Sequence, residues 1–252
     1  MSRPRLGWRK PLLIVAALAL MVATFSLGRW QLARAAEKQA VHAQALERAR
    51  QSVLDGTTLT GSLRGAQTAA LLHRRIALRG NWLPGHSVYL DNRVMERRTG
   101  FYVLTPLRLA GRDAVVLVQR GWAPRDLADP QSLPKVLTPP GEVQLEGVLM
   151  EQPSQAYALG TEGQGAIRQN LDLDAFRRET GLPLADLVVL QTGAPSEGLL
   201  RQWPAPLSGA DKNRGYALQW FGLCALIGLL FVWFQVVRPV YRFLRAPARP
   251  HA

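Results

Sequence analysis

The chain has 252 residues and a formal net charge of +13. A charge of this size can indicate nucleic-acid binding, but the positions of the cations argue against it here. Eight of its 31 Lys and Arg residues lie in residues 1–10 and 238–252, which leaves 23 against all 18 Asp and Glu in between. That excess of five is ordinary for a sizeable domain, so the sequence predicts no nucleic-acid partner.

Two long uncharged runs predict two membrane spans. Residues 11–28 read PLLIVAALALMVATFSLG, and the second run covers residues 215–237. A helix needs about 20 predominantly apolar residues to cross a bilayer core, and both runs are near or above that length. The backbone must satisfy its own hydrogen bonds inside the bilayer, so each run should be an α-helix. The lipid bilayer is therefore the first expected partner.

Cations flank the outer ends of both runs and predict the orientation. Lys and Arg near span ends stay on the cytoplasmic side, so both termini are expected inside. Only ten residues precede the first run, which leaves no room for an organelle transit peptide and favours a bacterial inner membrane. We predict a cytoplasmic tail (1–10), a first span (11–30), a periplasmic domain (31–214), a second span (215–237) and a basic cytoplasmic tail (238–252).

A cleaved signal peptide is the alternative interpretation of the first run. The residues ARA at 33–35 resemble a small-residue cleavage site. However, a signal h-region has about 7–15 residues, which is shorter than this run. Arg29 and Arg34 also intrude before the cleavage position. We therefore favour an uncleaved anchor.

The first span should continue outward as a helix, because residues 29–53 are rich in helix formers and lack Gly and Pro. Alternation of apolar and polar residues then predicts a series of half-buried strands. These lie at residues 76–82, 87–94, 100–111, 113–122, 142–150 and 185–193. The predicted fold class is an α+β membrane protein whose two transmembrane helices flank an antiparallel, β-rich extracytoplasmic domain. A small, partly closed barrel is one form that such a domain takes.

One short helix and two exposed loops complete the predicted domain. Asp172 suits the N-cap of the helix, Gly181 suits its C-terminal end, and Pro183 stops its continuation. Residues 124–141 are Pro-rich and polar, and residues 155–170 are rich in Gly and Gln. Such segments run over protein surfaces as loops.

The motifs of common enzymes are missing from the chain. It has no phosphate-binding G-x-x-x-x-G-K-[ST] loop, no G-x-S-x-G elbow, no H-E-x-x-H and no C-x-x-C. The four histidines, His42, His73, His86 and His251, are not paired at metal-ligand spacing. We therefore predict no catalytic residue and no enzyme activity.

Three stretches are more distinctive: RGNWLPGHSVYLDNR, VQRGW and KNRGYALQWF. The residues that stand out in the first two are Gly80, Trp82, Asp91, Arg93, Arg120, Gly121 and Trp122. Together with LGRWQLARAAEK after the first span, these stretches resemble the Surfeit locus protein family over nearly the whole chain. Each stretch alone is a weak signal, whereas their combination with two spans is quite specific.

The resemblance implies an inner-membrane assembly factor for cytochrome c oxidase without turnover of its own. Such a factor assists insertion of haem a into the catalytic subunit, or stabilises that subunit, as a scaffold or haem handler. The implied partners are the oxidase catalytic subunit and haem a synthase, with haem a as a transient cofactor and no other metal. The alternative is a bitopic envelope scaffold or sensor protein that binds a periplasmic partner and has no haem role.

The aromatic and charged residues of the first two stretches have two interpretations each. A Trp buries a large area, so Trp82 and Trp122 are expected to pack in the core rather than to stack on haem. Arg120 is expected to pair with a neighbouring acid, and a haem propionate is its alternative partner. Asp91 and Arg93 are expected to form a local ion pair.

Gly80 and Gly121 are expected to allow tight strand geometry or close approach of another chain.

Tyr216 and Trp220 open the second span and lie four apart, on one helix face. They suit an interfacial anchor, and the same face suits cover for a flat apolar macrocycle. Relatives often carry a His just before this stretch as the proposed haem ligand, and Asn213 takes that position here. A carboxamide is a poor iron ligand, so the metal ligand is left unassigned, with His73 and His86 as substitutes.

Overall fold

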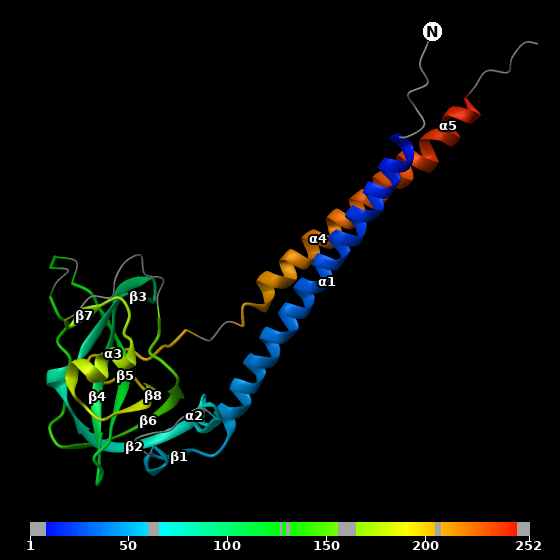
Figure 1. The fold of residues 1–252 in the computed structure, drawn as a ribbon. Helices are drawn as coiled ribbons and strands as arrows, with labels where there is room; N and C mark the ends of the chain where they lie inside the picture. The colour runs from blue at the N-terminus through cyan, green and yellow to red at the C-terminus, as the bar shows by residue number, and fades with distance from the viewer. Residues whose placement is uncertain are drawn as a thin grey trace, which may run out of the picture. The chain divides into compact units, whose positions relative to one another are not determined.

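A computed structural model describes residues 9–59, 66–126, 128–129, 132–155, 165–204 and 208–245 (Figure 1). Residues 1–43 and 206–252 form one unit, and residues 44–205 form a second. The first eight and last seven residues, which hold part of the predicted basic tails, lie outside the described residues. So do residues 156–164 of the predicted second loop.

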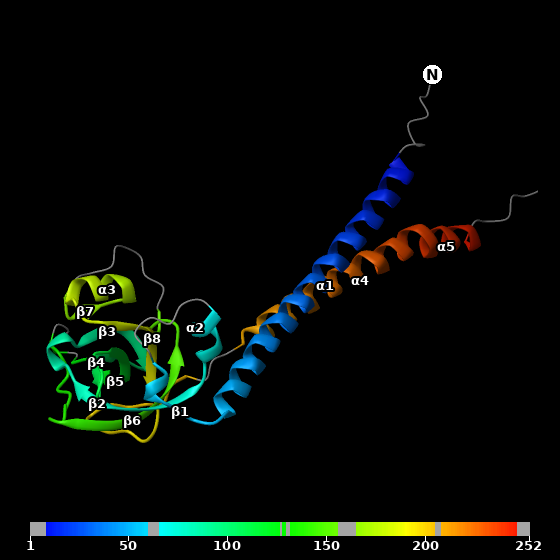
Figure 2. The same cartoon turned by 60° about the horizontal axis from the view of Figure 1, so that its bottom comes forward.

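The first unit contains most of α1 (Arg9–Arg50) and all of α4 (Ala210–Val232), two long helices that run side by side in both views (Figures 1 and 2). Both are long and apolar enough to cross a membrane. The two predicted apolar helices are therefore confirmed. α1 continues without a break to Arg50, as the composition of residues 29–53 predicted.

Small residues let the two helices approach closely. Buried positions in the pair are Thr24, Gly28, Ala35, Ala210 and Ala217. A Cβ atom on Gly28 would lie 2.6 Å from the Phe221 ring, and that ring lies 5.6 Å from the ring of Phe25. Such close packing replaces the hydrophobic driving force that helices lack in a lipid environment.

The second helix changes winding before it ends. A π-helical segment, η3 (Trp233–Val237), follows α4 and leads into α5 (Arg238–Leu244). Pro239 in α5 has no N–H to donate to the carbonyl of Gln235 four residues earlier. The wider turn just before this proline is a common way to absorb such a defect.

The second unit is a closed five-stranded β-barrel. Its strands are β2 (Arg75–Trp82), β6 (Glu142–Met150), β8 (Leu184–Gln191), β5 (Val115–Pro124) and β4 (Arg98–Leu109), bonded in that order. A further pairing of β4 with β2 closes the ring. β3 (Val88–Met95) pairs with β4 outside the ring, and the two-residue strands β1 (Leu54–Asp55) and β7 (Ile167–Arg168) extend β2 and β3. The predicted fold class is therefore confirmed.

The barrel is mixed rather than wholly antiparallel. Among the described residues, β8 is antiparallel to β6 and parallel to β5. β8 lies between these two strands, which follow each other in the chain and run in opposite directions. A strand between two opposed neighbours must be parallel to one of them. Hairpin order along the sequence could not show this insertion.

Short helices fill the connections of the second unit. They are η1 (Gly56–Thr58), α2 (Ala66–Leu71), η2 (Pro84–His86) and α3 (Leu173–Thr180). The predicted ends of α3 are confirmed: the Asp172 carboxylate accepts a hydrogen bond from the Ala175 N–H at 2.6 Å. Gly181 follows the helix with a φ of 65°, and its N–H donates to the Arg177 carbonyl.

Two apolar layers stabilise the second unit. One contains residues of all five barrel strands, including Leu78, Leu107, Val118, Leu149 and Val189. The other lies between β3, β4, β5 and β8 and the helix α3, whose Phe176 is 2% exposed. The strands β4 and β5 serve both layers, which explains why they are buried almost continuously instead of at alternate positions.

Gly80 lies where β2 meets β4. It is paired with Leu109, and a Cβ atom on Gly80 would lie 2.1 Å from the Arg108 carbonyl oxygen. Gly121 is similar, since its Cβ would lie 2.6 Å from that of Leu199. Both glycines therefore permit tight strand geometry, because another segment of the same chain approaches them closely, and the approach of another chain stays a prediction.

Replacing Gly80 by alanine should open or strain the closure between β2 and β4. We expect the free energy of unfolding to fall by about 1–3 kcal/mol, because the obstructing atom belongs to the backbone and cannot rotate away. Chemical denaturation of the full chain in detergent, followed by tryptophan fluorescence, measures the loss. Gly85→Ala is the matched control, since nothing lies within 4 Å of its Cβ position. Equal stability of the two variants would contradict this account of the closure.

Candidate functional site

The candidate residues named in the sequence analysis are divided between the two units. Asn213, Tyr216 and Trp220 belong to α4 of the helix pair. Those of the first two stretches all belong to the barrel unit, on β2, β3 and β5. Each group has its own polar network.

Asn213 joins the two helices of the first unit. Its side-chain amide nitrogen donates to the Gln31 Oε1 at 2.6 Å, and its Oδ1 accepts from the Lys38 Nζ at 2.8 Å. Both ends of the carboxamide are therefore engaged with α1. Sequence analysis missed Gln31 and Lys38, although their seven-residue spacing places them on one helix face.

Helical spacing extends this contact into a continuous face. Tyr216 and Trp220 follow Asn213 by three and seven residues, and Arg34 and Lys38 follow Gln31 by the same intervals. Lys212 lies four residues before Tyr216 and shares its side of α4. We name this surface the Asn213 face. It consists of Gln31, Arg34, Lys38, Lys212, Asn213, Tyr216 and Trp220.

The Asn213 face has a polar end and an aromatic end. The polar end has three cations, of which Arg34 is paired with Glu37 at 3.1 Å. Lys38 bonds to an amide oxygen, and Lys212 has no polar partner among the residues that the structure describes. At the aromatic end, Tyr216 is 53% exposed and Trp220 is partly buried. The predicted shared face of Tyr216 and Trp220 thus adjoins the Asn213 contact.

These residues do not offer an evident iron ligand. The Asn213 carboxamide is a poor ligand for iron and is already bonded at both ends. His86 lies on η2 and His73 lies between α2 and β2, both in the second unit. His251 lies outside the described residues. The use of His73 or His86 as a substitute stays a prediction.

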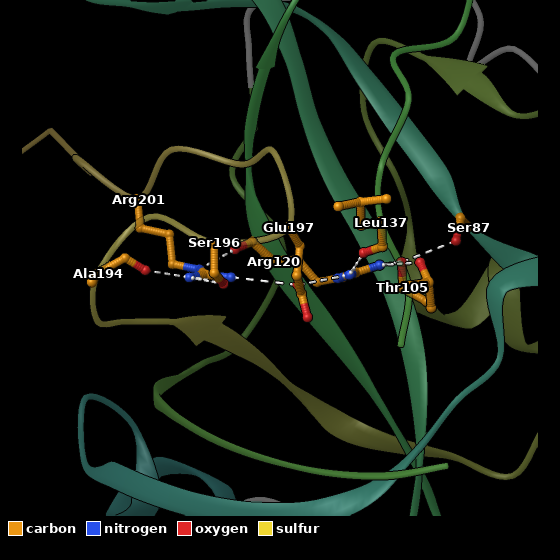
Figure 3. A network of polar contacts seen from close by, with 9 residues as sticks. Ser87, Thr105, Arg120, Leu137, Ala194, Ser196, Glu197 and Arg201 are labelled. Carbon is orange, nitrogen blue, oxygen red and sulfur yellow. Dashed lines mark hydrogen bonds and ion pairs between the residues drawn. The ribbon is translucent and has the colours of Figure 1, made fainter. Parts of the chain in front are cut away.

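Arg120 is the centre of the polar network in the barrel unit (Figure 3). Its side chain is 1% exposed and lies on the Trp82 ring, 4.5 Å from the centroid. Its guanidinium donates to the Glu197 carboxylate at 2.7 Å, to the Leu137 carbonyl at 2.8 Å and to the Thr138 hydroxyl at 2.9 Å. Arg120 therefore has the acid partner that was expected. Contact with a haem propionate stays a prediction.

Glu197 also lies close to a second buried arginine (Figure 3). The Arg201 Nη2 is 3.6 Å from the same carboxylate, and the Arg201 Nε donates to the Arg120 carbonyl at 2.7 Å. Burial lowers the pKa of the Arg201 guanidinium, and the Glu197 charge opposes that effect. Glu197 and Gly198 both have positive φ angles, so a tight turn presents the carboxylate. Two guanidinium groups thus share one negative charge.

The predicted ion pair between Asp91 and Arg93 is wrong. Asp91 pairs with Arg125, whereas Arg93 donates to the carbonyls of Ser154 at 2.9 Å and Gln169 at 2.7 Å. Asn92 between them has a φ of 60°, and the register with β4 shifts at this point. This bulge breaks the alternation that would have placed both side chains together.

Both tryptophans of the distinctive stretches pack in the core, as expected. Trp122 is fully buried, and its Nε1 donates to the Arg93 carbonyl at 2.8 Å. Trp82 is 7% exposed and packs in the barrel layer beneath Arg120. Their role as haem platforms has no support from this burial.

The SURF1 family model matches residues 18–225, which include both networks. The chain belongs to the SURF1 family. It is 24% identical to Surfeit locus protein 1 of Rattus norvegicus, over 86% of this chain and 73% of the relative. For the SURF1-like protein of Monosiga brevicollis the identity is 23%, over 92% and 91%. For Surfeit locus protein 1 of Xenopus tropicalis it is 25%, over 82% and 71%. The match to the SURF1 family thus spans the barrel and most of both long helices.

Neutralising Glu197 should leave two buried guanidinium groups of this SURF1 family protein without a counter-charge. We expect Glu197→Gln to lower the free energy of unfolding by about 3 kcal/mol, because removal of one partner strands a buried charge. Denaturant titration of the full chain measures the change. Glu146→Gln removes the exposed pair with Arg75, whose side chains are 48% and 55% exposed, and should cost less than about 1 kcal/mol. Similar losses in both variants would reject the central role of Glu197.

His73 should make stability sensitive to mild acid. Burial and, secondarily, the Arg48 charge lower the pKa of His73 from 6.5. The unfolded chain therefore binds a proton near pH 6.5 before the folded chain does, so stability is full above that pH and falls as the pH drops below it. His73→Asn tolerates the φ of 65° and does not titrate. We expect its denaturation midpoint to change less between pH 7.5 and 5.5 than that of the wild type; equal changes would contradict this assignment.

Proposed function

We propose that this protein is an assembly factor of the bacterial inner membrane for cytochrome c oxidase. It assists insertion of haem a into the catalytic subunit, or stabilises that subunit, and has no turnover of its own. Membership of the SURF1 family and two membrane-length helices, which precede and follow the barrel in the sequence, support this proposal. Both termini would be cytoplasmic and the barrel periplasmic, in accordance with the cations that flank the spans.

The state of Asn213 supports one of the two forms of this proposal. A haem handler needs a side chain that is free to bind iron at the end of the helix pair where Asn213 lies. The Asn213 amide is instead bonded to Gln31 and Lys38. We therefore favour the scaffold form, in which the helix pair presents a fixed surface to the catalytic subunit. Haem a synthase is the further proposed partner.

If haem a is held transiently, the Asn213 face offers the better fit of the two networks. Tyr216 would cover the apolar macrocycle together with Trp220, and the cations at the polar end would suit its carboxylates. Arg120 is the less accessible candidate, because its side chain is 1% exposed and bonded to Glu197. A propionate would have to displace that carboxylate.

The alternative function, a bitopic envelope scaffold or sensor with no haem role, shares the same fold. The two are distinguished by the fate of the oxidase rather than by any feature of the barrel. An absorption spectrum of the purified protein, with and without the co-expressed catalytic subunit, separates the scaffold form from the haem handler. The scaffold form predicts haem a in the co-expressed sample alone.

Deletion of the gene should lower the haem a content of the oxidase in isolated membranes. We expect wild-type protein to restore it, Tyr216→Ala to restore less, and Leu218→Ala to restore it fully. Leu218 is the matched control because it is 74% exposed and lies two residues from Tyr216, on another side of α4. Haem a content is measured from reduced-minus-oxidised spectra of membranes normalised to the catalytic subunit.

Unchanged oxidase in a deletion strain without a paralogue would reject the assembly role. Full restoration by a normally accumulating Tyr216→Ala variant would reject the part assigned to the Asn213 face, while leaving the assembly role intact.

A further inference from the structure

We propose that the Asn213 face binds an anionic phospholipid of the outer leaflet, with its phosphate at Lys212, Lys38 and Arg34. This inference needs only that α1 and α4 span the membrane with the barrel on its outer side, which is the orientation proposed above. It does not rest on a role in oxidase assembly.

The first argument is charge. Three cations gather at the polar end of the face, and Arg34 is the one with a carboxylate partner among the described residues, Glu37. Lys38 contacts a neutral amide, and Lys212 is exposed without a polar partner in the described part of the chain. Each Lys or Arg near an anionic membrane surface contributes about 1 kcal/mol of attraction. This end of the face therefore favours a negatively charged headgroup.

The second argument is depth. Trp30 and Tyr216 are 54% and 53% exposed, as aromatic residues at a membrane interface are. Lys212 precedes Tyr216 by one helical turn, which is about 6 Å along the axis and away from the apolar run. The polar layer of a bilayer leaflet is of similar thickness. The lysine thus lies where lipid phosphates lie.

The third argument is the apolar surface that continues inward from the cations. Trp220 and Leu223 follow Tyr216 at four and seven residues, so they extend the same side of α4. Leu223 is 42% exposed, and Trp220 is partly buried. An acyl chain can lie along these side chains while its phosphate contacts the cations. A free phosphate ion would use the cations alone, so the combination favours a lipid.

Another side of the helix pair lacks this arrangement. There, Arg214 donates to Gln39 at 2.8 Å and pairs with Asp211 at 3.1 Å, so its charge is matched. Arg29 is exposed, but it lies two residues before Gln31 and so on a different side of α1. Arg29 is therefore a control for a cation of the same helix pair that lies outside the face.

The test is native mass spectrometry of the full chain, delipidated in detergent and produced in a strain that makes no haem a. Phosphatidylglycerol and phosphatidylcholine with identical acyl chains are titrated in parallel. We expect tighter binding of phosphatidylglycerol, weakened about fivefold by Lys212→Ala and largely preserved in Lys212→Arg and Arg29→Ala. Circular dichroism confirms that each variant keeps its helices.

Three results would overturn the proposal. They are equal binding of the two lipids, equal weakening by Lys212→Ala and Arg29→Ala, and complete displacement of the lipid by millimolar glycerol 3-phosphate. The last result would assign the site to a soluble phosphate instead of a lipid. Because these measurements involve no oxidase and no haem a, their failure leaves the deletion phenotype unaffected, and the reverse also holds.

Discussion

Closure of the barrel between β2 and β4 is the constraint on which the second unit depends. Along one edge, β4 pairs with β3 as far as Leu104 and with β2 from Leu107 onward. This edge of the strand therefore has two successive neighbours. Pro106 lies at this change of neighbour, where a missing N–H removes no ladder bond. Its carbonyl accepts from the Leu83 N–H at 2.9 Å. Gly80 then allows the two backbones to meet, and Trp82 is brought beneath Arg120.

The buried charges of the barrel follow from that closure. Once Trp82 and β5 are fixed, the Arg120 guanidinium is enclosed and must be satisfied by atoms from elsewhere in the chain. A loop supplies Leu137 and Thr138, and the turn at residues 196–199 supplies Glu197. A buried arginine left without such partners would be strongly destabilising. The network therefore fixes two irregular segments, the loop and the turn, against the barrel wall. Apolar packing alone would not specify the positions of these two segments.

Local patterns predicted the six long strands, the continuous first helix and both ends of α3. In these elements the signal lies within a few residues, as in the bond from the Ala175 N–H to Asp172. The insertion of β8 between β5 and β6, the bulge at Asn92 and the partners Gln31 and Glu197 were not predicted. Each depends on contacts between residues far apart in the chain: Gln31 and Asn213 are 182 positions apart, and Arg120 and Glu197 are 77. Periodicity in one sequence contains no information on such pairs.

The side chain at position 213 determines what this surface is able to do. A histidine there would present a ring nitrogen, whereas the carboxamide has a donor and an acceptor that match Gln31 and Lys38 on the neighbouring helix. Engaging Lys38 in this way holds its ammonium group beside α4, on the side that Lys212 and Tyr216 share. The same two hydrogen bonds that leave no Asn213 atom free to bind iron thus help to form the polar end of the Asn213 face, next to its aromatic end. A surface of that kind selects a ligand by its shape and charge distribution, and metal coordination is not required for it to bind an anionic amphiphile.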